Sequence, residues 1–299
     1  MKILITGASG MLGYDLWQVL SNEHELYGLG RRDCPDFIKR DKWLQLDLTD
    51  PSETYQGVTK VNPELVIHTA ALTDVDACEL KPEEAYLINT LATRNVALAC
   101  QRFDTVVLYI STDYVFAGEK NTPYREDDLP NPINIYGKTK YGGEFYVRHL
   151  LNKFYVLRTA WLFGKRKKNF ISNIVGQIKS SGTQPNIKVV ADQVGSPTYT
   201  KDLALAISEL IKKNLYGVYH LTNTNSTSRY QIAEEIANFF GYRGKILPIR
   251  QTELKRPARR PQYSVLDNYN WCIQGFKPLR GWKEALREYL GEANSNIKN

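Results

Sequence analysis

The chain has 299 residues, of which 42% are hydrophobic, and a formal net charge of +7. It contains no run of 18 apolar residues, which excludes a membrane span, and its start, MKILITGASGMLG, lacks the layout of a signal peptide. The basic residues are dispersed except at 165–168 and 255–260, so an anionic small substrate explains the charge and no nucleic-acid partner is expected.

The cysteines and histidines are scattered along the chain. Cys34, Cys78, Cys100 and Cys272 form no Cys-x-x-Cys pair, and the four histidines are isolated from one another. This distribution argues against a zinc site and against a disulfide framework. We therefore expect no metal and a location in a reducing cytoplasm.

The first predicted element is a short apolar strand, Lys2–Thr6, followed directly by glycines. Gly7, Gly10 and Gly13 repeat every third residue and open a helical run to Leu20. In a dinucleotide site such glycines permit a tight turn, let the backbone approach a pyrophosphate and allow close helix–sheet packing. We expect cofactor contacts from Gly7, Ser9, Gly10, Met11, Leu12 and Gly13.

The next strands carry candidate contacts to the adenosine end of a cofactor. Glu25–Leu29 leads to Arg31 and Arg32, where an acidic residue would select NAD, whereas arginines suit a 2′-phosphate. This favours NADPH, with NADH possible as well; the alternative is two solvated loop arginines. Leu44–Leu48 is predicted as a third strand whose Asp47 and Leu48 lie near the adenine.

The alternation of strand and helix continues through residue 102. Leu65–Thr69 is predicted as a fourth buried strand that runs into Ala70, Ala71 and Leu72, where small residues let a cofactor lie close. His68 inside this strand is expected to be a core histidine, and Glu83–Arg102 a long helix that contains Asn89. This alternation of strands and helices predicts an α/β fold with a Rossmann-like, doubly wound parallel sheet.

A fifth strand leads to the candidate catalytic residues. Val106–Ile110 is a continuous apolar run that ends at Ser111 and Thr112, and reactive groups of open α/β sheets lie just beyond such strand ends. Tyr136 and Lys140 share one face of a predicted helix, Ile135–Leu150. An ammonium near a phenol lowers its pKa, so Tyr136 is a candidate to exchange a proton with a substrate oxygen that Thr112 holds. The alternative is a surface Tyr/Lys pair.

The rest of the chain predicts a smaller lobe. Residues 117–134 are expected to form a loop over the site, and the sixth strand, Phe154–Arg158, places Trp161 where it would stack on a ligand or be buried. The further expected elements are helices at Phe170–Ser180, Thr200–Lys212 and Tyr230–Phe240, strands at Lys188–Ala191 and Gly217–Leu221, and a frayed tail at 292–299. The proline-flanked segment 255–261 cannot be helical, and its arginines suit a diphosphate or are solvated.

This pattern predicts two functional parts. Residues 1–164 are expected to form the dinucleotide-binding domain, to which 198–223 also contribute, and 165–197 with 224–299 a C-terminal α/β substrate-binding lobe.

These residues resemble, from end to end, those of the extended short-chain dehydrogenases/reductases. The resemblance rests on the three glycines at 7, 10 and 13, on Asn89, on Ser111 and Thr112, and on Tyr136 and Lys140. Within that group the chain is most similar to the dTDP-4-dehydrorhamnose reductases, and the stretches that carry this similarity are 68–71, 73–76, 111–116, 136–140, 158–161, 192–195 and 256–261.

The resemblance implies an NADPH-dependent oxidoreductase of dTDP-rhamnose biosynthesis. Such enzymes reduce the C4 keto group of dTDP-4-dehydro-6-deoxy-L-mannose to give dTDP-L-rhamnose. The catalytic residues would be Thr112, Tyr136 and Lys140, with Lys140 also holding the nicotinamide ribose. The sugar would contact Thr73, Thr112, Asp113, Tyr114 and Trp161, and Arg260 would bind the diphosphate. A monomer or homodimer is implied; some members dimerise through magnesium, but its acidic ligands are not identifiable in this sequence.

Two alternatives stay open. One is a reductase of another nucleotide-linked 4-keto-6-deoxy sugar, because the sequence does not reveal the face of hydride attack. The other is a non-catalytic regulatory subunit on the same scaffold. The intact glycines and the Tyr136/Lys140 pair favour an enzyme over such a subunit.

Overall fold

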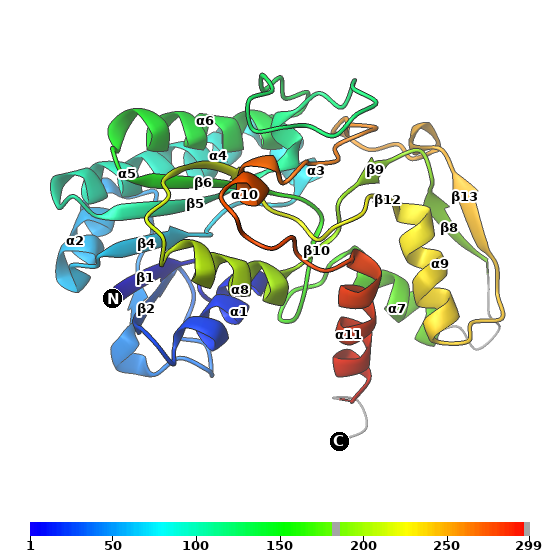
Figure 1. The fold of residues 1–299 in the computed structure, drawn as a ribbon, viewed down its shortest axis with the longest axis horizontal. Coiled ribbons are helices and arrows are strands. Elements are labelled where there is room, and N and C mark those ends of the chain that lie inside the picture. Colours follow the sequence, from blue (N-terminus) through cyan, green and yellow to red (C-terminus); the bar gives the residue numbers. More distant parts are fainter. Residues whose placement is uncertain (181–185, 296–299) are drawn as a thin grey trace.

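A computed structural model describes residues 1–180 and 186–295 and shows an α/β protein built on a seven-stranded parallel sheet (Figure 1). The strand order is β11-β6-β5-β4-β1-β2-β3, so the chain winds outward in both directions from β1 and β4. The predicted doubly wound sheet is therefore confirmed. The strands are β1 (Lys2–Thr6), β2 (Glu25–Gly30), β3 (Trp43–Gln45), β4 (Leu65–His68), β5 (Val106–Thr112), β6 (Phe154–Thr159) and β11 (Gly217–His220).

Helices cover both faces of this sheet. α1 (Met11–Leu20) and α8 (Thr200–Leu210) contact each other on one face, and α2 (Pro51–Val61), α5 (Ala92–Arg102) and α6 (Ile135–Leu150) pack side by side on the other. Because each strand is buried from both sides, its side chains supply two separate apolar clusters, with Ile3 and Ile5 in one and Leu4 in the other. His68 lies in this core as expected, 1% exposed and hydrogen-bonded to the hydroxyls of Thr6 and Thr93.

A smaller α/β lobe follows the sixth strand, at the right of Figure 1. It has its own apolar cluster, which includes Phe163, Ile174, Ile232 and Trp282. Its helices are α7 (Phe170–Ser180), α9 (Arg229–Phe239) and α11 (Trp282–Ser295), and β8 (Ile187–Val190) pairs in parallel with β13 (Ile246–Ile249). Two short pairs join it to the main sheet region, β7 (Leu162–Phe163) with β10 (Thr198–Tyr199) and β9 (Val194–Gly195) with β12 (Thr227–Ser228).

Several elements differ from those predicted. The third strand ends at Gln45 rather than Leu48, so Asp47 lies in the loop beyond the sheet edge. The helix expected at 83–102 consists of α4 (Pro82–Tyr86), a π-helical turn η2 (Leu87–Leu91) and α5. Four helices were not predicted, namely α2, α3 (Val75–Leu80), α10 (Tyr269–Ile273) and α11; the remaining short helices are η1 (Arg40–Lys42), η3 (Asp113–Val115) and η4 (Gln251–Glu253). The segment 255–261 is not helical, as expected.

None of residues 117–134 lines the cavity that collects the predicted site residues, so the expected loop over the site is not found. Tyr124 packs its ring on Phe116 and exchanges backbone hydrogen bonds with Val265 and Asp267, and Glu126 accepts hydrogen bonds from the amides of His220 and Asn270. The loop is therefore anchored to the C-terminal segment and to β11. Its polar composition, read as that of a cover, reflects these anchoring contacts.

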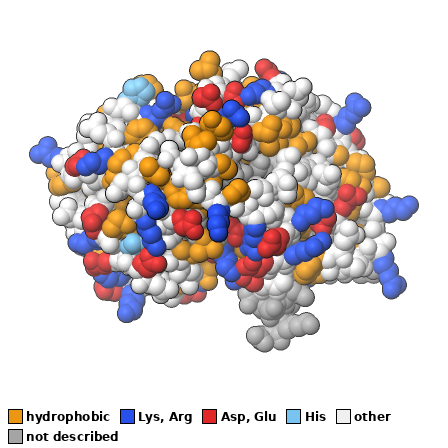
Figure 2. Space-filling model, in the orientation of Figure 1, with side chains coloured by type: hydrophobic (Ala, Val, Ile, Leu, Met, Phe, Trp, Pro, Cys, Tyr) orange, Lys and Arg blue, Asp and Glu red, His pale blue; other side chains and the backbone are white. Residues whose placement is uncertain are grey.

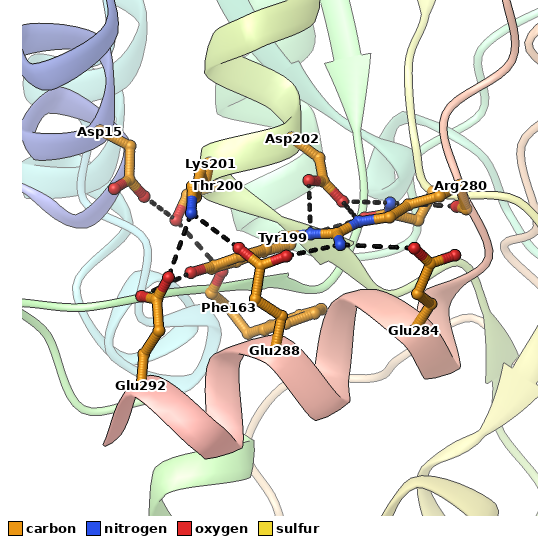
Figure 3. A network of polar contacts seen from close by, with 11 residues as sticks. Asp15, Phe163, Tyr199, Thr200, Lys201, Asp202, Arg280, Glu284, Glu288 and Glu292 are labelled. Carbon is orange, nitrogen blue, oxygen red and sulfur yellow. Dashed lines mark hydrogen bonds and ion pairs between the residues drawn. The ribbon is translucent and has the colours of Figure 1, made fainter. Parts of the chain in front are cut away.

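The predicted frayed tail is wrong for residues 292–295, which belong to α11; residues 296–299 lie outside the described residues. Figure 3 shows how the helix is held. Glu292 accepts hydrogen bonds from Tyr199 and Lys201, and Arg280 pairs with Asp202 through two nitrogens at 2.8 and 2.9 Å. Partners from α8 and its N-terminal flank therefore tie α11 and the residue Arg280 before it to α8.

Charges of both signs are interspersed on the face shown in Figure 2. No helix in the described part of the chain is long and apolar enough to cross a membrane. Among residues 1–180 and 186–295, no group of three or more His, Cys, Asp or Glu side chains is arranged to hold a metal ion.

Candidate active site

A cavity of about 640 Å³ lies at the carboxyl ends of β1, β4, β5 and β6 and collects most of the predicted site residues. The predicted residues that line it are Gly7, Ser9, Gly10, Met11, Leu12, Arg31, Arg32, Asp47, Leu48, Ala70, Ala71, Thr73, Thr112, Asp113, Tyr114, Tyr136, Lys140 and Trp161. Gly13, Leu72 and Arg260 are not among its lining residues. A second cavity of about 620 Å³ between α9 and α11 contains none of the predicted site residues.

The glycine turn after β1 is shaped by close backbone approaches. Gly7 has a φ of +68°, and a Cβ on it would lie 2.8 Å from the amide nitrogen of Ala70. A Cβ on Gly13 would lie 2.5 Å from the carbonyl oxygen of Gly7, so this glycine serves the packing of α1 rather than the cavity wall. Helix α1 starts after Gly10, which has no side chain to cap it, so the first-turn N–H groups can face an anion.

Arg31 and Arg32 lie beyond β2 at the end of the cavity that Asp47 and Leu48 also line. Their carbonyl oxygens accept hydrogen bonds from the side chains of Gln45 and Trp43, which fix the loop while both arginine side chains stay exposed. Asp47 accepts hydrogen bonds from the amide and hydroxyl of Thr49. Two cations and a fixed carboxylate thus meet at this end of the site.

The candidate catalytic residues converge on the middle of the cavity. Thr112 ends β5, is 6% exposed, and donates from its hydroxyl to Asp113 while accepting from the amide of Tyr114. Tyr136 and Lys140 project from the first two turns of α6, which Asn134 caps by accepting the Gly137 N–H at 2.8 Å. The Tyr136 ring packs edge-on against Tyr114.

The expected lowering of the Tyr136 pKa by Lys140 is not found. Burial raises the pKa of the Tyr136 phenol well above its usual value, and the interaction with the Thr112 hydroxyl offsets this only in part. Burial also lowers the pKa of Lys140 to about 7, against a raising effect of Glu144. Both groups are desolvated, and desolvation favours the neutral form of each.

Two buried networks hold the catalytic helix against the sheet. Asn89, in the π-helical turn, donates to the carbonyl of Leu72 and the hydroxyl of Thr139 and accepts from the Leu72 amide. This explains why Leu72 anchors the loop without lining the cavity. Glu144, one turn beyond Lys140, pairs with Arg158 on β6 at 2.8 Å, and both are at most 1% exposed. These contacts fix α6 relative to β4 and β6.

Asp113 and Trp161 shape the wall that faces the smaller lobe. The pKa of Asp113 is raised to about 6, mainly by burial. Hydrogen bonds from Ser264 and Thr112 act in the opposite direction and offset part of the effect of burial. Trp161 has a φ of +47°, which is unusual for a bulky residue. A Cβ on Gly195 would lie 2.5 Å from its ring, so Gly195 leaves the space that the indole occupies.

Arg260 does not lie free for a diphosphate as expected. Its two terminal nitrogens donate to both carboxylate oxygens of Asp76, at 3.0 and 2.7 Å. No local pattern predicts this pairing, because the two residues are 184 positions apart.

Sequence reasoning also missed several polar residues that line the cavity. Arg229 begins α9, and Lys167 donates to the hydroxyl of Thr73 at 3.0 Å across the cavity mouth. Lys167 was noticed only as part of a basic run. The other missed polar side chains are those of Thr49, Thr69, Thr159, Arg166, Lys168 and Asn169. Arg229 reaches the cavity because α9 of the smaller lobe docks there, which no local pattern reveals.

The chain is similar to known proteins in its family, in its sequence and in its structure. The family model described as RmlD substrate binding domain matches residues 1–295. A dTDP-4-dehydrorhamnose reductase of Streptomyces griseus is 38% identical over 95% of this chain and 91% of its own length. A probable dTDP-4,6-dihydroxy-2-methyloxan-3-one 4-ketoreductase of Streptomyces antibioticus is 38% identical over 96% of this chain and 94% of its own.

The structural comparison gives the same relationship. The crystal structure of dTDP-4-dehydrorhamnose reductase from Bacillus anthracis in complex with NADP superimposes with a TM-score of 0.89 and 38% identity, covering 97% of this chain and 99% of that one. A UDP-glucose 4-epimerase of Thermus thermophilus, 20% identical with a TM-score of 0.82, shares the fold. With its glycine turn, its Thr112, Tyr136 and Lys140 cluster and these full-length matches, the chain belongs to the RmlD family within the extended short-chain dehydrogenases/reductases.

Proposed function

We infer that this protein reduces the C4 keto group of dTDP-4-dehydro-6-deoxy-L-mannose to give dTDP-L-rhamnose, with NADPH as the reductant. The observation that carries this inference is that one cavity joins the glycine turn to Thr112, Tyr136 and Lys140. Reductases related to the chain at 38% identity over nearly its full length support the same activity.

The dinucleotide end of the cavity suits NADPH. The close approach that Gly7 permits and the first turn of α1 would hold the pyrophosphate. Ser9, Met11 and Leu12 would line it, and Ala70, Ala71 and the loop of Leu72 would border the adenine and ribose with Asp47 and Leu48. Arg31 and Arg32 would hold the 2′-phosphate. When bound, NADPH supplies the hydride that adds to C4 of the sugar.

Tyr136 provides the proton that the reduced oxygen needs. Its raised pKa keeps the phenol protonated at neutral pH, so its proton is available to the more basic alkoxide that forms at C4 of the sugar. Thr112 would donate a hydrogen bond to the same oxygen and so orient the carbonyl. Lys140 would hold the nicotinamide ribose and, when protonated, stabilise the Tyr136 phenolate left after proton transfer.

The lobe-facing wall receives the sugar. Thr73, Asp113, Tyr114 and Trp161 line this part of the cavity and offer hydroxyl, carboxylate and aromatic contacts to a deoxy sugar. In this division of labour, residues 1–164 with 198–223 bind the cofactor, and 165–197 with 224–299 close the substrate side. We also propose a monomer or homodimer. A cytoplasmic location is proposed as well, and the four unpaired cysteines support it.

Product analysis tests this function. The purified protein is incubated with NADPH and dTDP-4-dehydro-6-deoxy-L-mannose, and the product is identified by NMR. We expect dTDP-L-rhamnose, whose C4 configuration is read from the ring proton couplings. The C4 epimer, dTDP-6-deoxy-L-talose, would contradict the assignment while leaving the reductase class intact, and no turnover would favour a regulatory subunit.

A second candidate is reduction of a different dTDP-linked 4-keto sugar. The relative from Streptomyces antibioticus supports it, since it is as similar to the chain as the rhamnose enzyme from Streptomyces griseus. Comparing kcat/KM for dTDP-4-dehydro-6-deoxy-L-mannose with kcat/KM for the other dTDP-linked 4-keto sugar decides between the two functions.

A further inference from the structure

Arg229 lines the cavity, yet the mechanism above gives it no role. It is the first residue of α9, where Ser228 caps the helix by accepting the Gln231 N–H at 3.1 Å. The carbon at the centre of its guanidinium lies 3.7 Å from the ring centroid of Trp161 and 4.9 Å from that of Phe170. These two aromatic faces fix the plane of the guanidinium, while its N–H groups lie at the edges.

The charge of Arg229 has no ion-pair partner among the described residues. The Asp113 carboxylate acts on it electrostatically but is occupied by hydrogen bonds from Thr112 and Ser264. Arg229 is only partly exposed, and burial lowers its pKa to about 10, so it stays charged at neutral pH. A partly buried cation that makes no direct ion pair is unfavourable for folding, so folding alone does not explain it.

The surroundings of Arg229 favour an anion with more than one charge. Arg256 and Arg260 also act electrostatically on Arg229, and all three guanidiniums act on the Tyr114 hydroxyl. Asp76 neutralises Arg260 through two hydrogen bonds, whereas Arg229 keeps its full charge at the cavity wall.

Two further polar atoms of residues that line the cavity lack partners. The indole nitrogen of Trp161 and the hydroxyl of Thr159 are buried without a hydrogen bond to any described residue, although both residues line the cavity. Buried polar atoms are normally paired, so these two mark a place where a ligand supplies the missing partners. The indole nitrogen belongs to the ring on which the Arg229 guanidinium stacks, and Thr159 is two residues earlier in the chain.

We propose that Arg229 binds the diphosphate of the nucleotide sugar and that Trp161 holds its guanidinium in place. Arg229, rather than Arg260, then supplies the main cationic contact to the substrate. This assignment rests on the proposed function, because it takes a nucleotide diphosphate as the substrate's charged part. It makes Arg229 a residue that selects diphosphate-linked sugars over free ones.

The test compares Arg229→Gln and Arg229→Lys with wild-type protein by calorimetric titration with dTDP in the presence of NADP⁺. Arg125→Gln is the matched control, because Arg125 stacks 4.3 Å from the Tyr269 ring outside the cavity. Loss of a buried charge contact predicts about 30- to 5,000-fold weaker dTDP binding for Arg229→Gln. Arg229→Lys should be weakened less, and NADP⁺ affinity and the dTDP affinity of Arg125→Gln should be unchanged.

Thermal unfolding separates binding from a structural role. Because the cation is unneutralised, the ligand-free Arg229→Gln protein should unfold at the same temperature as wild type or higher. Unchanged dTDP affinity in Arg229→Gln would overturn the proposal. So would a lowered unfolding temperature accompanied by loss of NADP⁺ binding in both variants.

A parallel titration with pyrophosphate distinguishes failure of this inference from failure of the proposed function. If wild-type protein binds pyrophosphate but not dTDP, and Arg229→Gln loses pyrophosphate, the anion contact stands and the nucleotide assignment is wrong. If wild-type protein binds neither, both proposals are wrong.

Discussion

Tyr136 and Lys140 are both buried, and burial shifts their pKa values in opposite directions. It raises the pKa of the phenol and lowers that of the ammonium to about 7. At neutral pH the tyrosine is therefore fully protonated and the lysine is near its midpoint. A short helix face thus presents a protonated acid beside an amine whose charge responds to its surroundings.

Replacing Tyr136 by Phe removes one oxygen and little volume. We expect kcat to fall by about 10²- to 10⁴-fold, the usual effect of a positioned general acid, with NADPH affinity retained. Steady-state kinetics and a fluorescence titration measure the two quantities. Tyr146→Phe, on the same helix but outside the cavity, is the control. Retention of most activity in Tyr136→Phe would place the acid elsewhere.

Arg31 and Arg32 predict the cofactor preference. If they contact the 2′-phosphate, the Arg31→Ala, Arg32→Ala double variant should raise KM for NADPH by about 10- to 100-fold, the value of charge-assisted hydrogen bonds, and hardly change KM for NADH. KM values for both cofactors are measured at saturating keto sugar. An equal increase for both would show that neither arginine touches the phosphate.

Lys140 predicts how stability depends on pH. Its pKa is about 7 in the folded protein and 10.5 when unperturbed, so between these values the unfolded chain binds more protons. The free energy of unfolding therefore rises as pH increases from about 7 to 10.5. Below pH 7 the lysine is charged in both states, and the full cost of burying its charge destabilises the folded protein. Lys140→Met should be most stable relative to wild type near pH 6, with the advantage shrinking towards pH 10.

Urea unfolding midpoints at pH 6, 8 and 10 measure this difference. Lys138→Met, an exposed lysine on the same helix, should show no such trend. A Lys140→Met advantage that does not vary with pH would contradict the assignment of the lowered pKa.

At the scale of elements, α11 is held by ion pairs rather than by an apolar face alone. Arg280 lies between the two halves, pairs with Asp202 at 2.8 Å and with Glu288 at 2.5 Å, and is 25% exposed (Figure 3). Removing it leaves Asp202, which is 10% exposed, without its cation. The helix links the smaller lobe to α8, so its attachment sets how the two halves meet.

Arg280→Met should therefore destabilise the protein by about 1–3 kcal/mol, between the values for exposed and buried pairs. The exposed pair Lys212–Glu23 is the control, and Lys212→Met should cost about 0–1 kcal/mol. Chemical unfolding measures both. Equal effects of the two substitutions would show that the network adds nothing to the packing of α11.

At the scale of the whole molecule, the site exists only where two bodies of chain meet. The sheet supplies the glycine turn, Thr112 and the helix of Tyr136, while Trp161 and Arg229 come from segments that belong to or border the smaller lobe. β11 returns from beyond residue 216 to pair with β6 at the sheet edge. The chain therefore passes between the two halves more than once, which couples their positions.

Elements whose cause is local could be predicted from the sequence. A buried strand followed by three spaced glycines has few alternatives, because steric limits on φ leave that turn to glycine. The spacing of four residues between Tyr136 and Lys140 places both on one face because of the helical repeat. Doubly wound topology followed from the alternation of strands and helices. Both ends of α6 and the first residue of α7 were predicted to the residue, because helical periodicity is a local property.

Only the tertiary structure decided what depends on distant partners. Arg260 is neutralised by Asp76 across 184 positions, Arg229 acquires its place from the docking of α9, and the C-terminal helix is ordered by Lys165, Lys201 and Tyr199. The pKa of Tyr136 rises because of burial, which no local spacing encodes. Spacing along a helix or strand is a property of the local chain, whereas charge neutralisation and desolvation depend on which distant segments fold against it.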